Sequence, residues 1–151
     1  MKKQKLEALD LRFISFLRTH YVLIARIAIF VVFFWFGALK LLGLSPAGPL
    51  AEALTERTVG LQYFDVLFMI LSLIECVIGV LFLFPRAIRV VFPLLLVHMA
   101  VVCSPLLLVP ELVWTAPFVP TLEGQYIIKN IIIVALAIAL AAATKPLKRL
   151  T

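Results

Sequence analysis

The sequence of 151 residues has little charge and few of the residues that most often carry chemistry. Aspartate, glutamate, lysine and arginine together make up 15% of the chain, and there are two cysteines and two histidines. It contains no C-x-x-C pair, no phosphate-cradling glycine loop and no serine nucleophile elbow. These absences argue against a thioredoxin-like redox site, a nucleotide-binding loop and a serine hydrolase.

The cysteines and histidines that do occur are poorly placed for a disulfide, a haem or a metal. At about 1.5 Å of rise per helical residue, Cys76 and Cys103 differ in depth by roughly 10 Å, too far for a disulfide. His20 lies at one membrane edge and His98 at mid-depth, so the two cannot be paired axial ligands of a haem. Glu75 and His98 alone supply too few ligands for a metal site. We therefore predict buried, unpaired apolar cysteines and no bound metal.

Apolar residues are what the sequence has in excess. They make up 64% of the chain, against about 45–50% in soluble domains, and the mean hydropathy is +1.16. About 20 apolar residues in a helix cross a hydrocarbon core about 30 Å thick. Four runs are long enough: residues 21–42, 63–84, 87–109 and 126–143. We predict an all-α protein, a single domain over residues 1–151 that forms an integral membrane four-helix bundle.

The basic residues alternate between the segments that join these runs. They precede the first run, fill the second turn and follow the last run: Lys2, Lys3, Lys5, Arg12, Arg18, Arg86, Arg89, Lys145, Lys148 and Arg149. The other two loops together carry only Arg57. By the positive-inside rule, this pattern predicts a multi-pass protein of the inner (plasma) membrane with both termini cytoplasmic. The net charge of +6 then reflects topology and contact with anionic lipid, and no nucleic-acid partner is expected.

Three segments outside the centres of the runs have patterns of their own. Apolar residues at helical spacing among basic ones predict a short helix over residues 4–18 that lies on the cytoplasmic leaflet. Residues 50–57 are expected to form one or two amphipathic turns, and Trp114 and Phe118 suit an outer aromatic belt. Ala135, Ala139 and Ala143 permit close helix contact, either within the bundle or in a homo-oligomer.

Glu75 lies near the middle of the run 63–84, where a charged side chain costs roughly 2.5–3.5 kcal/mol. Helical geometry puts His98 at a similar depth, and Ser72, Glu75 and Gly79 on one face. A carboxylate beside an imidazole predicts a hydrogen-bonded pair that shares a proton. The alternative is a protonated Glu75 that only ties two helices together.

A second set of polar residues lies on the first and last runs. Arg26 and Lys40 point the same way on the first run, and a cluster opens the last run: Gln125, Tyr126, Lys129 and Asn130. Lys40 and Lys129 lie at similar depth near the outer mouth. They form a candidate site for an anionic or carbonyl-bearing ligand, with Tyr126 and Gln125 as further hydrogen-bonding groups. The alternative is snorkelling, in which each ammonium reaches the membrane interface.

Three stretches of the sequence resemble a known family. They are FGALKL at residues 36–41, IECVIG at 74–79 followed by FPR at 84–86, and LEGQYIIKN at 122–130. These stretches are similar to parts of the DoxX-like membrane proteins. The last is similar above all to a related branch that includes a reactive-chlorine-resistance membrane protein. The resemblance spans all four helices, and residues 123–130 are its most specific part.

The resemblance implies a small four-helix inner-membrane protein linked to redox or oxidative-stress systems. By the same resemblance, the expected site residues are Lys40, Glu75, Lys129 and Asn130. The leading hypothesis is a quinone-binding or partner-docking subunit with a polar intramembrane cavity, in which Glu75 and His98 handle a proton. A small proton-coupled transporter or exporter that uses Glu75 is the alternative. An enzyme acting on lipophilic electrophiles ranks third, and no sequence feature separates the first two.

Overall fold

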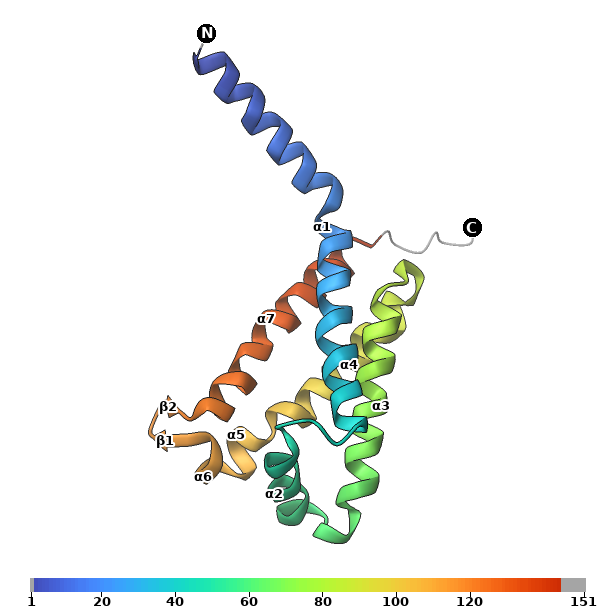
Figure 1. Cartoon of the computed structure of the whole chain (residues 1–151), viewed down its shortest axis with the longest axis vertical. Helices are drawn as coiled ribbons and strands as arrows, with labels where there is room; N and C mark the ends of the chain where they lie inside the picture. Colours follow the sequence, from blue (N-terminus) through green and yellow to red (C-terminus); the bar gives the residue numbers. More distant parts are fainter. Residues whose placement is uncertain (1, 145–151) are drawn as a thin grey trace, which may run out of the picture.

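The computed structural model describes residues 2–144, which form an almost entirely helical chain (Figure 1). Four helices are long and apolar enough to cross a membrane: α1 (Lys2–Leu41), α3 (Phe64–Phe82), α4 (Ile88–Cys103), extended by neighbouring short helices, and α7 (Leu122–Ala142). The predicted all-α class and the four predicted runs are thereby confirmed. Lys145, Lys148 and Arg149, which belong to the predicted positive-inside pattern, lie outside the described residues.

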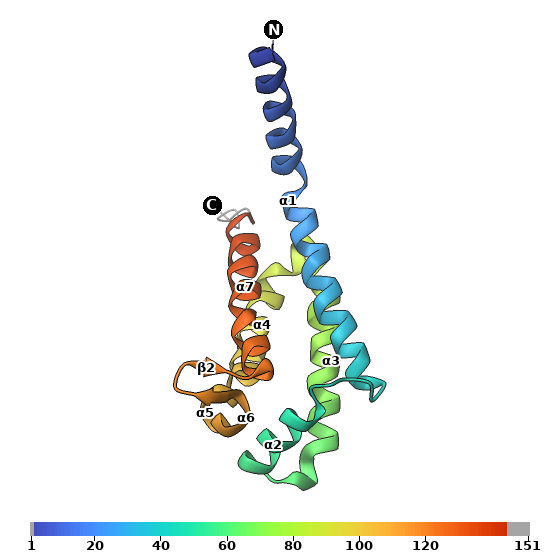
Figure 2. The ribbon, with the colours of Figure 1, turned by 60° about the vertical axis from the view of Figure 1, so that its left-hand side comes forward.

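The long helices are arranged as two pairs. α1 lies along α3 over much of its length, and α4 packs against α7. Contacts of α3 with α4, and of α1 with α7, join the two pairs. Figure 2 shows the α1–α3 pair beside the α4–α7 pair, with the connecting segments at the ends.

A narrow core fills the space between the pairs. Every long helix contributes to it: Ala25, Ile29, Phe33, Ile78, Phe82, Ile88, Val91, Leu95, Met99, Ala137 and Leu140. The outward faces of the same helices stay apolar, and Trp35, Val97 and Ile131 are 60%, 66% and 71% exposed. Apolar faces of this extent are rare on soluble monomers and typical of helices that contact lipid.

Two glycines let the backbones of α1 and α3 approach closely. A Cβ on Gly37 of α1 would lie 2.8 Å from the Ser72 carbonyl oxygen and from Cys76 Sγ of α3. A Cβ on Gly79 of α3 would lie 2.8 Å from the Phe34 backbone nitrogen of α1. Each helix therefore places a glycine against the other backbone, which is how small residues tighten membrane helix pairs.

The connecting segments gather at the two ends of the bundle (Figure 1). One end carries α2 (Gly48–Thr58), η1 (Leu61–Tyr63), α5 (Pro105–Leu108), α6 (Pro110–Val113) and the strands β1 (Trp114–Ala116) and β2 (Val119–Pro120). The opposite end carries the tight turn η2 (Pro85–Ala87). Helix α2 confirms that the segment predicted to form one or two turns at residues 50–57 is helical, and it is longer than predicted, with 11 residues. The hairpin of β1 and β2 was not predicted.

The N-terminal segment differs from the prediction of a separate helix over residues 4–18. Helix α1 runs without a break from Lys2 to Leu41. Residues 2–36 contain no glycine or proline, so nothing in the backbone chemistry ends the helix before the span. In both ribbon views the N-terminal half of α1 changes direction moderately and projects beyond the bundle (Figures 1 and 2).

Two other helix boundaries differ from the predicted ones, each for a local reason. The predicted helix over residues 87–109 is interrupted after Cys103, because Pro105 has no N–H to continue the hydrogen-bond pattern and instead begins α5. Helix α7 begins at Leu122 and not at residue 126, because the Thr121 hydroxyl caps it by accepting from the Gly124 N–H at 3.1 Å.

Candidate functional site

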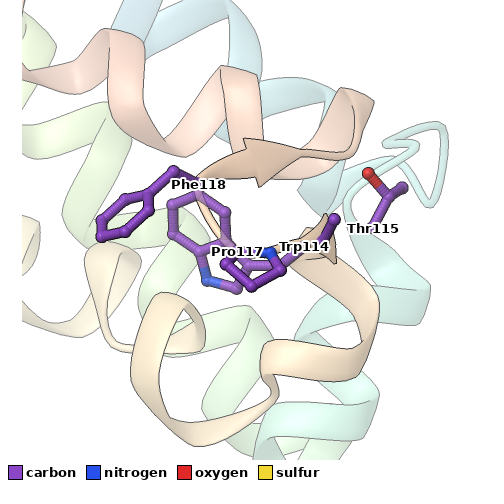
Figure 3. Close-up of a pocket in the computed structure, with 5 residues that line it drawn as sticks. Trp114, Thr115, Pro117 and Phe118 are labelled. Atoms are coloured by element: carbon purple, nitrogen blue, oxygen red, sulfur yellow. The ribbon is translucent and has the colours of Figure 1, made fainter.

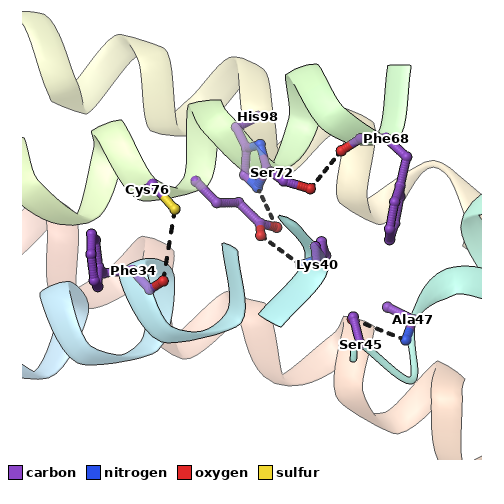
Figure 4. A network of polar contacts seen from close by, with 9 residues as sticks. Phe34, Lys40, Ser45, Ala47, Phe68, Ser72, Cys76 and His98 are labelled. Carbon is purple, nitrogen blue, oxygen red and sulfur yellow. Dashed lines mark hydrogen bonds and ion pairs between the residues drawn. The ribbon is translucent and has the colours of Figure 1, made fainter. Parts of the chain in front are cut away.

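Three polar side chains from three helices meet inside the bundle. Lys40 Nζ of α1 donates to Glu75 Oε2 of α3 at 2.5 Å, and His98 Nε2 of α4 lies 3.4 Å from Glu75 Oε1. Their side chains are only 10%, 9% and 2% exposed, respectively. Figure 4 shows the contacts from Lys40 and His98 converging on the two oxygens of one carboxylate.

The local sequence explains how each member reaches the cluster. Glu75 lies on the buried face of α3 between Ser72 and Gly79, as its spacing predicted. Lys40 is in the last turn of α1, where a cation complements the helix dipole. Gly37, one turn earlier, brings α1 so close to α3 that the lysine side chain can reach the carboxylate.

Pairing makes these buried charges tolerable. A carboxylate or an ammonium buried alone costs several kcal/mol, and mutual attraction offsets that cost only with good geometry and hydrogen bonds. Both oxygens of Glu75 have a partner here. The predicted contact of Glu75 with His98 is confirmed, whereas the snorkelling alternative for Lys40 is wrong because its ammonium turns inward to Glu75.

The two ring nitrogens of His98 have different surroundings. Its Nε2 faces Glu75, whereas Nδ1 is buried and has no hydrogen-bond partner among the residues that the structure describes. The Phe33 ring contacts the imidazole edge to face at 5.7 Å between centroids. A carboxylate on Nε2 favours the tautomer that carries its proton there, and this leaves a basic lone pair on Nδ1.

The two neighbouring hydroxyl and thiol groups bind backbone carbonyls and do not join the cluster. Ser72 Oγ donates to the Phe68 carbonyl at 2.5 Å, and Cys76 Sγ lies 3.8 Å from the Phe34 carbonyl (Figure 4). Cys76 and Cys103 are both free, but they are half-buried and not fully buried as predicted. Within residues 2–144 no group of three or more histidine, cysteine, aspartate or glutamate side chains is arranged to hold a metal.

Arg26 is buried away from this cluster. Its side chain donates from Nη1 to the carbonyl of Phe82, the last residue of α3, at 2.8 Å, and the residue is 5% exposed. The guanidinium thus satisfies a C-terminal carbonyl of α3 and complements that helix dipole. The structure gives Arg26 a role in helix packing, separate from the Glu75 cluster.

The polar residues of α7 lie apart from both the Glu75 cluster and Arg26. Gln125, Tyr126 and Lys129 are exposed and Asn130 is half-buried. Lys129 Nζ lies over the Tyr126 ring, 5.0 Å from its centroid, which is a cation–π contact. Lys40 and Lys129 therefore have different partners in this structure, one buried and one exposed.

A surface pocket of about 380 Å³ lies at the hairpin and not at the cluster (Figure 3). It is lined by residues 114–118, and Trp114 Nε1 donates to the Leu106 carbonyl at 3.1 Å. Phe118 at the tip is 94% exposed and has a φ of 62°, which is unusual for an aromatic residue. The apolar lining of this pocket and its position at one end of the bundle suit the aromatic belt that the sequence predicted.

Comparisons of the chain with protein-family models, with curated proteins and with solved structures find no match. The geometry of the Lys40–Glu75–His98 cluster is therefore the main basis for any functional conclusion.

Proposed function

We propose that this chain is a multi-pass inner-membrane protein in which the Lys40–Glu75–His98 cluster handles protons for a membrane quinone. The observation that carries the proposal is the buried Nδ1 of His98, which has no hydrogen-bond partner within residues 2–144, in a ring whose other nitrogen faces Glu75. The resemblance to DoxX-like proteins supplies the redox association. Electrons are exchanged with a redox partner protein in the membrane.

The membrane placement in this proposal follows from charge and length. The end of the bundle with η2 and the N-terminal half of α1 carries Arg86, Arg89, Arg12 and Arg18. The other end carries Arg57 and most of the carboxylates. The positive-inside rule assigns the basic end to the cytoplasm.

The chemistry rests on a carboxylate that orients an imidazole. Glu75 holds the Nε2 proton of His98, so Nδ1 is the acceptor, and the imidazolium formed on protonation is stabilised by the same carboxylate. Lys40 supplies the counter-charge for the Glu75 carboxylate in a low-dielectric setting, where the pair is favoured over either charge alone. Such a unit takes up one proton at Nδ1 and releases it again.

The matching ligand group is an O–H that gives up its proton on oxidation. A quinol (the reduced quinone) has two such groups and loses two protons and two electrons when it becomes a quinone. One proton goes to His98 Nδ1, the other to water at the membrane surface, and both electrons go to the redox partner. A quinone has no O–H to donate, so the quinol is the better ligand for a neutral His98.

The direct test is binding of a short-chain quinol and its quinone to the purified protein in nanodiscs. We expect the quinol to bind about tenfold more tightly than the quinone, the ratio that a hydrogen bond of 1–1.5 kcal/mol gives. His98→Gln keeps an N–H near Glu75 but replaces the basic Nδ1 with a non-basic amide oxygen, so it should weaken the preference. Glu75→Gln should weaken it as well.

The matched control is Glu111→Gln, the same substitution at an exposed carboxylate that pairs with Arg57. It should bind both forms as the wild type does. Lys129→Met tests separately whether the polar group on α7 contributes to ligand binding. Unchanged quinol preference in both His98→Gln and Glu75→Gln would refute the proposal.

A proton-coupled transporter is the second candidate, and one observation favours it. The Glu75 carboxylate joins α1 and α4 to α3 through Lys40 and His98, so protonation of Glu75 removes its charge from contacts among three helices. Proton binding is thereby linked to helix contacts, which is what coupled transport requires. Proteoliposome flux that follows a pH gradient and is lost in Glu75→Gln, with no quinol preference, would select this function.

A further inference from the structure

Helix α1 is too long for the membrane alone. Its 40 residues span about 60 Å, whereas a hydrocarbon core is about 30 Å thick. Residues 3–19 are all exposed, and in both ribbon views this half of the helix projects beyond the bundle (Figures 1 and 2). Most helical stability in proteins comes from packing of an apolar face, so a projecting helix whose apolar residues are all exposed favours a covering surface.

The projecting segment carries an apolar stripe with the spacing of a coiled coil. Leu6, Leu9, Phe13 and Phe16 are separated by three, four and three residues, and are 71%, 63%, 60% and 54% exposed. This spacing corresponds to positions a and d of a heptad repeat; His20 occupies the next position a, and Leu23 and Ile27 return the apolar pattern in the span. We infer that the stripe is the contact surface for a second copy of this chain, in a parallel two-helix coil.

The position of the stripe leaves room for a second copy. The bundle-facing side of α1 is marked by Ala25, Ile29 and Phe33, which are buried. At 100° per residue, the stripe of Leu6 and Phe13 points roughly 160° away from that side. Two copies that meet through α1 therefore keep their bundles on opposite sides of the contact.

The charges fit a parallel pair. Copies in one membrane share an orientation, so their N-terminal helices leave it side by side and in the same direction. With Leu6 at position a, Lys5 occupies position g and Asp10 position e, and in a parallel coil g of one helix meets e of the other. Each dimer thus gains two Lys5–Asp10 pairs of opposite charge.

The alternative occupant is the anionic leaflet. To lie there, the segment must turn by about 90° from a span along the membrane normal. Residues 2–36 have no glycine or proline, and the hydrogen-bonded helix continues through the bend. The Thr19 hydroxyl bonds back to the Ser15 carbonyl at 2.9 Å, a contact that bends helices moderately. This geometry favours a helix that leaves the membrane.

Cysteine crosslinking of the full-length protein in nanodiscs tests the contact. In a background of Cys76→Ser and Cys103→Ser, Leu9→Cys should form the disulfide-linked dimer on mild oxidation. Ser15→Cys is the control, because Ser15 is exposed on the opposite face of the same helix segment. Equal crosslinking at both positions, or none at Leu9→Cys, would overturn the proposal.

Charge-exchange variants, made in the protein with its native cysteines, test the register of the two helices in the coil. Lys5→Glu and Asp10→Lys each put like charges together twice per dimer, which should weaken dimerisation about tenfold. The double variant restores opposite charges and should recover the wild-type dimer in mass photometry. Failure of the double variant to recover it would contradict the register. Quenching of Phe13→Trp fluorescence by brominated lipid would assign the stripe to the leaflet instead.

Discussion

Single residues decide how the centre of this protein can work. Glu75 binds Lys40 through one oxygen and faces His98 with the other, so each of the three side chains depends on its neighbours. Nδ1 of His98 has no hydrogen-bond partner in the described part of the chain. Removing one member therefore changes what the others can do, and the effects are not expected to add.

A double-mutant cycle measures the dependence of Lys40 on Glu75. Lys40→Met leaves the Glu75 carboxylate buried with only His98, and we expect a loss of about 3 kcal/mol, the lower end for breaking a buried pair. Glu75→Gln leaves the ammonium without its counter-charge and should cost a similar amount. The double variant has no unpaired charge and should cost less than either single change. Reversible unfolding in detergent gives the three values, and simple additivity would contradict the buried ion pair.

The sequence predicted part of this cluster and missed part. Glu75 and His98 were paired because helical rise gives two midspan residues on adjacent helices a common depth. Lys40 was not assigned to Glu75, because it lies near a helix end, where a lysine usually extends to the interface. Which way a long side chain turns depends on the distance between α1 and α3, and the close approach at Gly37 sets that distance.

At the level of elements, a close helix pair and a capped helix shape the bundle. Run length alone predicts that a helix exists, as it did for the four long helices here. Where a helix begins or breaks depends on individual contacts, such as the Thr121 cap and the break at Pro105. The hairpin of β1 and β2 lacks the alternating pattern that predicts strands, because its strands have three and two residues.

Alanine at the two contact glycines should separate α1 from α3. In Gly37→Ala the new Cβ meets the Ser72 carbonyl, and in Gly79→Ala it meets the Phe34 backbone nitrogen, each at 2.8 Å. Backbone atoms cannot move aside as side chains do, so we expect a loss of about 1–3 kcal/mol for each variant. Gly48→Ala is the control, since nothing lies within 4 Å of its Cβ position. Equal melting temperatures for all three variants would show that the helices are not in tight contact.

The start of α7 depends on the hydroxyl of Thr121. That oxygen accepts from the Gly124 N–H at 3.1 Å, and its proton is donated to the Leu112 carbonyl at 2.9 Å. Thr121→Ala should therefore lower the free energy of unfolding by about 1–2 kcal/mol. Thr121→Ser keeps the hydroxyl and should stay close to the wild type. If serine and alanine have the same effect, the lost methyl group and not the cap is responsible.

Across the whole molecule, the charges divide between its two ends. One end bears α2, α6 and the first turns of α3 and α7, and it carries five of the eight acidic residues: Glu52, Glu56, Asp65, Glu111 and Glu123. The other bears η2 and the projecting half of α1, where arginine and lysine predominate. The sequence alone predicted that basic residues gather at one end of the bundle. The fold adds that most acidic residues lie at the opposite end.

This division predicts how the protein is oriented in a cell membrane. Arg86 and Thr115 are both exposed and lie at opposite ends of the bundle, in η2 and β1 respectively. In the Cys76→Ser, Cys103→Ser background, a membrane-impermeant maleimide should label Thr115→Cys in intact spheroplasts. Arg86→Cys should be labelled only after the membrane is opened, because positively charged turns stay in the cytoplasm. An Arg86→Glu, Arg89→Glu variant, which reverses the charge of that turn, should mix the two orientations and label Thr115→Cys only in part. Labelling of Arg86→Cys in intact spheroplasts would invert the assignment and place the N-terminal helix outside the cell.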